Sequence, residues 1–194
     1  FNTKPFPDLY VKAINYFKNY IEKAPDGRFA LKSIEEIIKL DKSLSNYDNL
    51  LIAKGYYANG EFEKSKKFLN KTTLAESWSD FAKNEYKLGN KEKGNYYTEL
   101  GLKQHAGNTA QDDVYEVIDD YVAAASTRTE GITKLVNLGA NSTGADYIAY
   151  LNCNEVVGEN VKEACFRSLY EKYPNGQFSA DSLYNLFMAK YLQK

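Results

Sequence analysis

The 194-residue sequence is poor in the residue types that most often carry chemistry. It contains 2 Cys, 1 His, 1 Met, 1 Trp and 4 Pro. The single histidine, His105, cannot form a zinc-binding cluster, and any Ser/His/Asp set would have to include it. Its position near a predicted helix end favours a structural role at the helix C-terminus. We therefore expect no catalytic residue, no metal site and no cofactor in this stretch of chain.

An excess of one charge and long apolar runs are also lacking. The 25 basic and 26 acidic side chains give a formal net charge of −1, and the mean hydropathy is −0.57. A balanced charge creates no positive field that would gather phosphates, so nucleic acid is not expected as a partner. No apolar run approaches the roughly 18 residues of a transmembrane helix, so no transmembrane segment is expected.

The few prolines and glycines interrupt a strong helical pattern. Apolar residues recur four positions apart, as in Leu9, Ala13, Phe17 and Ile21, and strand-like alternation is scarce. Short clusters of Gly, Asn, Asp and Pro separate about eleven segments of helical length. These segments are 8–24, 28–42, 46–59, 61–71, 74–88, 90–106, 110–125, 127–138, 144–157, 159–173 and 178–194. The sequence thus predicts an all-α fold.

One segment of the sequence occurs twice, 149 residues apart. FKNYIEKAPDGRFALKS begins at Phe17, and FRSLYEKYPNGQFSADS begins at Phe166. Each copy predicts a helix that ends before Pro and a tight Pro-(Asp/Asn)-Gly turn. Each also predicts a phenylalanine, Phe29 or Phe178, that returns to the core as the next helix begins. An α-α corner is therefore expected at two places in the chain.

A second pair of turns lies in the middle of the chain. Gly60 and Gly89 each end one predicted helix directly before another begins. Glycine suits this place because a helix C-terminus needs a left-handed residue, and such short turns place neighbouring helices antiparallel. Together with the duplicated corner, these turns predict a superhelix of about eleven antiparallel paired helices. We expect residues 1–194 to form a single helical-repeat domain, as a fragment of a longer chain.

The residues around these two turns resemble the tetratricopeptide repeat. The copy that ends at Gly89 has the family's offsets at Trp78, Phe81, Ala82 and Tyr86. The copy that ends at Gly60 has a corresponding set at Ile52, Ala53, Tyr56, Tyr57, Phe62 and Phe68. The pattern departs from the family at Asn49, Ser65 and Gly94, and its spacing is shorter than the family's 34 residues. The resemblance is best over 46–102 and implies tetratricopeptide-like helix pairs that bind protein or peptide partners.

A narrower resemblance concerns the order of the elements. The corner F-x-x-L-x-x-x-Y-P-x-G-x-F, irregular helix pairs and the stretch TEGITKLVNLGANSTGADYIAYL are similar to the superhelix preceding the catalytic domain of soluble lytic transglycosylases. This resemblance implies a non-catalytic arm that contacts peptidoglycan in the bacterial periplasm, in a chain that continues past Lys194. Glu76 and Ser77 begin like the catalytic Glu-Ser signature of that family, but Gly-Leu-Met-Gln does not follow. No catalytic residue is therefore carried over.

The densest charge in the sequence is acidic and belongs to the predicted helix 110–125. Its members are Asp112, Asp113, Glu116, Asp119 and Asp120. On a helix, Asp112, Glu116 and either Asp119 or Asp120 share one face. We interpret this face as solvated, with favourable negative charge at the helix start. The alternatives are a divalent-ion site and a hydrolase that uses Asp113 or Glu116.

The two cysteines, Cys153 and Cys165, are twelve residues apart. On one unbroken helix they would lie about 18 Å apart in height, too far for a disulfide. If the chain reverses at 158–160, they face each other across a helix hairpin, and a disulfide is feasible. The alternative is a pair of small apolar side chains packed together. An oxidised pair would favour an exported protein.

These patterns favour a non-catalytic helical-repeat scaffold that mediates protein-protein or cell-wall interactions. Its most specific form is the superhelical arm of a peptidoglycan lytic transglycosylase. One alternative is a periplasmic or cytoplasmic tetratricopeptide-type adaptor that binds peptide partners, and another is an all-α hydrolase that uses carboxylates. The expected location is periplasmic or extracytoplasmic, with the cytoplasm as the alternative.

Overall fold

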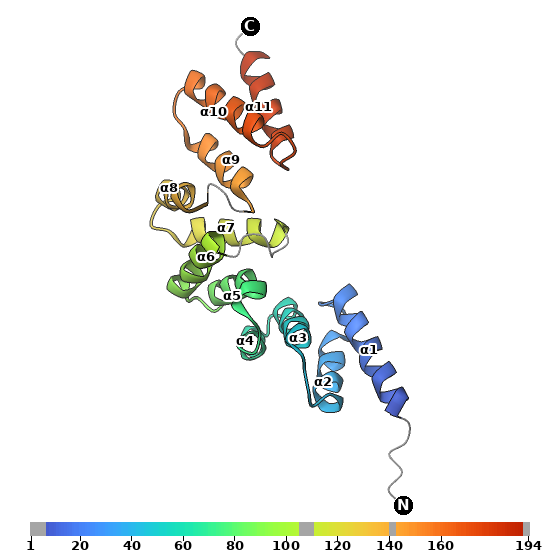
Figure 1. Ribbon diagram of the computed structural model, residues 1–194. Coiled ribbons are helices and arrows are strands. Elements are labelled where there is room, and N and C mark those ends of the chain that lie inside the picture. The colour runs from blue at the N-terminus through green and yellow to red at the C-terminus, as the bar shows by residue number, and fades with distance from the viewer. Residues whose placement is uncertain (1–6, 105–110, 140–142, 192–194) are drawn as a thin grey trace, which may run out of the picture. The chain divides into compact units, whose positions relative to one another are not determined.

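The protein is described by a computed structural model over residues 7–104, 111–139 and 143–191. These residues form eleven α-helices and no β-strand, so the predicted all-α class is confirmed (Figure 1). Each predicted segment holds one helix, and most of the described bounds lie within two residues of the expected ones. Among the described helices, none combines the length and the apolar character that crossing a bilayer requires.

The chain divides into two compact units, Phe1–Asn90 and Lys91–Lys194. The first unit contains α1 (Pro7–Lys23), α2 (Ala30–Leu40), α3 (Asn46–Ala58), α4 (Phe62–Leu69) and α5 (Leu74–Lys87). The second unit contains α6 (Lys91–Gln104), α7 (Gln111–Ala124), α8 (Arg128–Gly139), α9 (Ala145–Glu155), α10 (Glu159–Lys172) and α11 (Ser179–Tyr191). The expectation of a single repeat domain over 1–194, with a superhelical antiparallel course, stays a prediction.

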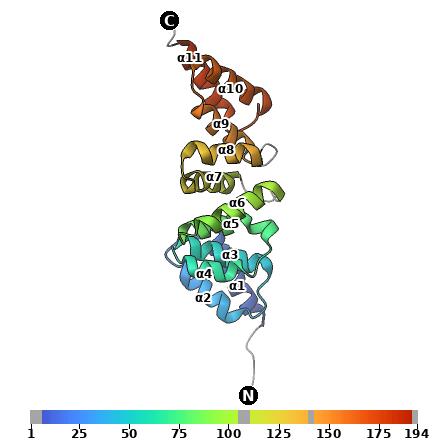
Figure 2. The same ribbon diagram turned by 90° about the vertical axis from the view of Figure 1, so that its left-hand side faces the viewer.

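Within each unit, a helix packs mainly on the helices next to it in the chain (Figure 2). In the first unit, α3 contacts α1, α2, α4 and α5. In the second unit the contacts run from α6 to α7 and onward in order to α11, with α6 also touching α8. Contacts between chain neighbours are typical of solenoids, in which each helix pair is covered by the next.

The core of the first unit lies where α1, α2 and α3 meet. Its buried side chains are Ile21, Ile34, Ile37, Leu51, Ile52 and Tyr56. Gly55 brings α3 close to the other two helices, because an added Cβ would lie 2.7 Å from Ile34 Cδ1 and 3.1 Å from Ile21 Cγ2. A small residue on α3 is thus required for the close approach of the three helices.

The two middle turns form the same backbone motif. Gly60 and Gly89 have φ values of 75° and 79°, the left-handed conformation that the sequence predicts for them. The Gly60 amide donates to the Tyr57 carbonyl, and the next amide, of Glu61, donates to the Tyr56 carbonyl. In the second turn, the Gly89 amide donates to the Tyr86 carbonyl and the Asn90 amide to the Glu85 carbonyl. Each turn is a Schellman motif that satisfies the last carbonyls of its helix.

The two α-α corners also share their backbone hydrogen bonds. The Gly27 amide donates to the Ala24 carbonyl and the Ala30 amide to the Gly27 carbonyl. In the second copy, the amides of Gly176 and Ser179 donate to the carbonyls of Tyr173 and Gly176. In both corners the helix therefore ends before Pro and a tight turn follows, as predicted.

The phenylalanines of the two corners differ in their surroundings. Phe178 is half-buried, whereas Phe29 is exposed. The prediction that Phe29 returns to the core is therefore wrong. Its ring meets only the edge of Tyr20, with centroids 6.4 Å apart, and the guanidinium of Arg28 among the ring contacts described.

Candidate functional site

An open apolar hollow of about 290 Å³ lies between α8, α9 and α10 in the second unit. Its floor is formed by Ile148 on α9 and Leu169 on α10, both buried. The polar side chains at the hollow are Asn152, Ser168 and Lys172. A concave apolar surface with a few polar groups is the usual form of a binding site for a small ligand or a peptide side chain. We refer to this hollow as the α8–α10 groove.

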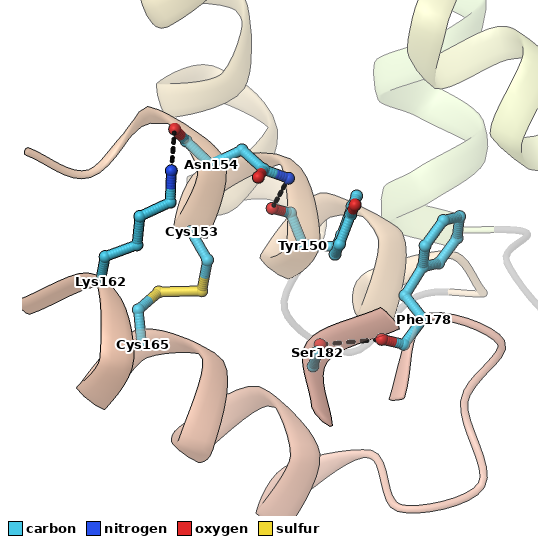
Figure 3. The surroundings of a disulfide bond; sticks show 7 residues. All are labelled: Tyr150, Cys153, Asn154, Lys162, Cys165, Phe178 and Ser182. Carbon is cyan, nitrogen blue, oxygen red and sulfur yellow. Dashed lines mark hydrogen bonds between the residues drawn. A yellow bond between two sulfur atoms is a disulfide. The ribbon is translucent and has the colours of Figure 1, made fainter. Parts of the chain in front are cut away.

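A disulfide between Cys153 on α9 and Cys165 on α10 borders the groove (Figure 3). The Cα atoms are 5.5 Å apart, and the chain turns between the two helices at Gly158, which has a φ of 98°. The structure thus places the two cysteines as the pairing hypothesis requires. Their oxidation in the cell stays a prediction.

The contacts around the disulfide fix the wall of the groove. Cys153, Phe166 and Leu169 are the buried members of one apolar cluster. The Lys162 ammonium donates to the Asn154 carbonyl at 3.4 Å, which adds a second link between α10 and the end of α9. The disulfide adds a covalent link to these non-covalent contacts between α9 and α10.

An aromatic stack joins the corner before α11 to α9. Phe178 lies between the rings of Tyr147 and Tyr150, with centroids 4.6 Å and 4.9 Å away and interplanar angles of 20° and 27°. Tyr115 of α7 meets Phe178 edge-on at 5.2 Å. Figure 3 shows the Phe178 ring next to Tyr150. Stacked and edge-on arrangements of this kind stabilise aromatic clusters beyond the area that they bury.

Two carboxylates, the buried Asp146 and the exposed Asp119, accept hydrogen bonds from the tyrosines of this cluster. The Tyr115 hydroxyl donates to Asp146 at 3.1 Å and 3.2 Å from the two carboxylate oxygens. Burial, together with the charge of Asp146, raises the pKa of Tyr115 to about 12. Tyr147 donates to Asp119 at 2.5 Å, and burial and that carboxylate raise its pKa as well. These groups are structural donors and acceptors, because ionising either tyrosine beside a carboxylate is unfavourable.

The predicted acidic face lies on α7. Asp112 and Glu116 are exposed and Asp113 is half-buried, while Asp119 is the acceptor for Tyr147. Over the described ranges, no group of three or more His, Cys, Asp or Glu side chains is arranged to hold a metal ion. On this face Asp119 has a structural role, as the acceptor for the Tyr147 hydroxyl.

Two further sequence candidates have different outcomes. Glu76 accepts hydrogen bonds from Asn46 of α3 and, at 2.9 Å, from the Thr73 hydroxyl. It therefore fastens the start of α5 to α3. His105, and residues 140–142 of the loop from Gly139 to Gly144, lie outside the described residues.

In the first unit, one buried carboxylate organises the start of α3. Asp48 forms a capping box with Ser45, and the Lys18 ammonium of α1 lies 2.6 Å from its Oδ1 atom. Burial alone would raise the pKa of Asp48, but the hydrogen bonds from Lys18 and Ser45 outweigh it and hold the pKa below its usual value. The S-x-x-D spacing is the local signal from which this cap could have been found, whereas the lysine comes from another helix and has no such signal.

Comparison of the chain with models of protein families, with curated proteins and with solved structures gave no match.

The disulfide gives a direct test of how α9 and α10 are held together. Reduction should lower the free energy of unfolding by about 2–3 kcal/mol, as is usual for a bond that closes a loop of about a dozen residues. Urea unfolding followed by circular dichroism, with and without dithiothreitol, measures the change. The double variant Cys153→Ala/Cys165→Ala is the control and should not respond to the reductant. Identical unfolding curves for the native chain in both conditions would show that the bond is absent.

The Tyr115–Asp146 pair predicts a loss of stability at alkaline pH. Because the folded pKa of Tyr115 lies above the unfolded value of 10.0, its contribution is complete below pH 10 and declines as pH rises through about 12. Tyr115→Phe should lower stability at pH 8 by about 1–3 kcal/mol, because a buried carboxylate loses its donor. The variant should also lose less stability than the native chain between pH 9 and 11.5.

Urea unfolding across that pH range provides the measurement. Tyr16→Phe, at an exposed tyrosine of α1, is the matched control. It should change neither the stability at pH 8 nor the loss of stability between pH 9 and 11.5. Parallel pH profiles for Tyr115→Phe and the native chain would contradict the assignment of Tyr115.

Proposed function

We propose that this chain is a non-catalytic, tetratricopeptide-like scaffold whose helix pairs form an antiparallel superhelix and bind a protein or peptide partner. The observation that carries the proposal is the exact reuse of local structure. Two corners share one set of backbone hydrogen bonds, and two middle turns share one Schellman motif. Repetition of a unit that packs only on its neighbours is how solenoids build long binding surfaces.

The α8–α10 groove is the proposed binding site for the partner. Its floor is apolar and its rim carries Lys172, an exposed cation. The chemistry that fits this arrangement is an apolar side chain next to a carboxylate. The disulfide at the edge of the groove reduces the motion of its wall, which lowers the cost of ordering the site on binding.

The more specific form of the proposal is the superhelical arm of a peptidoglycan lytic transglycosylase. The resemblance of the corner and of the helix pairs supports this form. A disulfide persists in oxidising compartments, so the cysteine pair supports a periplasmic or extracytoplasmic location.

Binding to a displayed library of random twelve-residue peptides tests the scaffold proposal. Selected peptides should be rich in apolar and acidic residues, and Val136→Asp or Lys172→Glu should weaken their binding by about tenfold or more. Asn137→Asp on α8 and Lys67→Glu in the first unit make the same charge changes at exposed positions away from the groove. They should bind as the native chain does.

Two results would count against the scaffold. Selected peptides that bind both groove variants as tightly as the native chain would show that the groove is not the binding site. Release of soluble fragments from purified sacculi by this chain alone would contradict a non-catalytic role. Co-sedimentation with the same sacculi, without release, supports the transglycosylase arm over an adaptor that binds only peptides.

A further inference from the structure

The duplicated corner allows the two ends of the chain to be compared in register. The four backbone hydrogen bonds that begin at Ala24, Gly27, Ala30 and Ser33 recur at Tyr173, Gly176, Ser179 and Ser182. The pair α10–α11 therefore repeats the pair α1–α2 with a shift of 149 residues. A difference in burial between equivalent positions therefore shows that different elements pack on α1–α2 and on α10–α11.

One face of this repeated pair is buried in the first unit and open in the second. Ile21 and Ile34 are 1% and 0% exposed, whereas their equivalents Tyr170 and Leu183 are 37% and 45% exposed. One turn further along, Ile38 is partly buried, and its equivalent Phe187 is 63% exposed. The open face of α10–α11 is thus the face that is buried on α1–α2.

The phenylalanine of the corner shows the reverse difference. Phe29 is 54% exposed, whereas its equivalent Phe178 is stacked between Tyr147 and Tyr150 of α9. Each copy of the corner is therefore open on the side that the other copy has covered. Burial at these positions follows the presence of a covering helix and not the type of side chain.

The helix that covers the first copy is α3. Leu51 and Ile52 of α3 share the buried cluster with Ile21 and Ile34, and Gly55 lies one turn later where these two isoleucines approach most closely. The chemistry of a covering helix follows from this contact. A covering helix of this type has a small residue, with aliphatic residues three and four positions before it. The small residue faces Ile34 in the first copy and would face its equivalent, Leu183, in the second.

We propose that the open face formed by Tyr170, Leu183 and Phe187 is the seat of a further helix of the α3 type, C-terminal to residue 194 in the same polypeptide. The first copy supports a helix in cis, because only residues 41–45 separate α2 from the α3 that covers it. The aromatic side chains Tyr184, Phe187 and Tyr191 leave α11 with an exposed apolar surface, which such a helix would remove from water. This inference depends on the repeat architecture and not on the α8–α10 groove.

A graft of the chain's own sequence tests the proposal. Residues 41–60, which contain α3, are joined directly after Ala189, because Ala189 is the equivalent of Leu40. Cleavage by chymotrypsin within α11 is then followed by mass spectrometry. We expect the graft to slow this cleavage by about tenfold or more, because cleavage requires local opening of the helix.

The matched control carries Gly55→Leu in the grafted copy alone. The added side chain occupies the place of closest approach, so the control should be cleaved within about twofold of the native rate. The proposal would be overturned if both grafts slowed the cleavage of α11 equally. It would also be overturned if neither graft slowed it although circular dichroism showed that the added segment is helical.

A second measurement does not depend on the folding of the graft. Leu183→Ser/Phe187→Ser in the native chain should shift the melting temperature by no more than about 2 °C, whereas Ile34→Ser/Ile38→Ser should lower it by more than about 5 °C. If both double variants lowered the melting temperature equally, the α11 face would already be covered. A dimer in sedimentation velocity that Leu183→Ser/Phe187→Ser dissolves would assign the face to a second copy and also overturn the proposal.

Discussion

The structure depends on one constraint, which is that a single helix cannot hide its own apolar stripe. Ile34 and Ile37 of α2 are buried because α1 and α3 pack on them. Helices of 8 to 17 residues, as here, are marginal in isolation and gain their stability from such packing. Removing a neighbour therefore exposes a whole face, as the paired corners show. Gly55 belongs to the same constraint, because its lack of a side chain lets α3 pack closely on Ile21 and Ile34.

The same constraint explains where additional bonds occur. Between α9 and α10, the buried side chains Cys153, Phe166 and Leu169 pack together, and a disulfide joins the two helices there as well. The aromatic stack on Phe178 similarly fastens the second corner to α9. The groove that we propose as a binding site lies between helices joined in this way, which would lower the cost of ordering the site on binding.

Local features of the fold were predictable from the sequence because they depend on neighbouring residues. The spacing of apolar residues, the breaks at Gly and Pro, and the left-handed conformation of Gly60 and Gly89 all belong to this class. The wrong prediction for Phe29 has a non-local cause, because its burial needs rings such as those that α9 supplies to Phe178. The donor pairs Tyr115–Asp146 and Lys18–Asp48 join residues about 30 positions apart. No spacing rule in the sequence indicates such pairs, and the lining of the α8–α10 groove was missed for the same reason.

Native-state hydrogen exchange can compare the local stability of α2 with that of α11. The two helices follow the same corner and share its hydrogen bonds, but only α2 is covered on both sides by described helices of its unit. Amides from Ile34 to Ile38 should exchange at least about a hundredfold more slowly than those from Leu183 to Phe187. Equal protection of the two segments would contradict the claim that covering by the next helix determines burial and local stability.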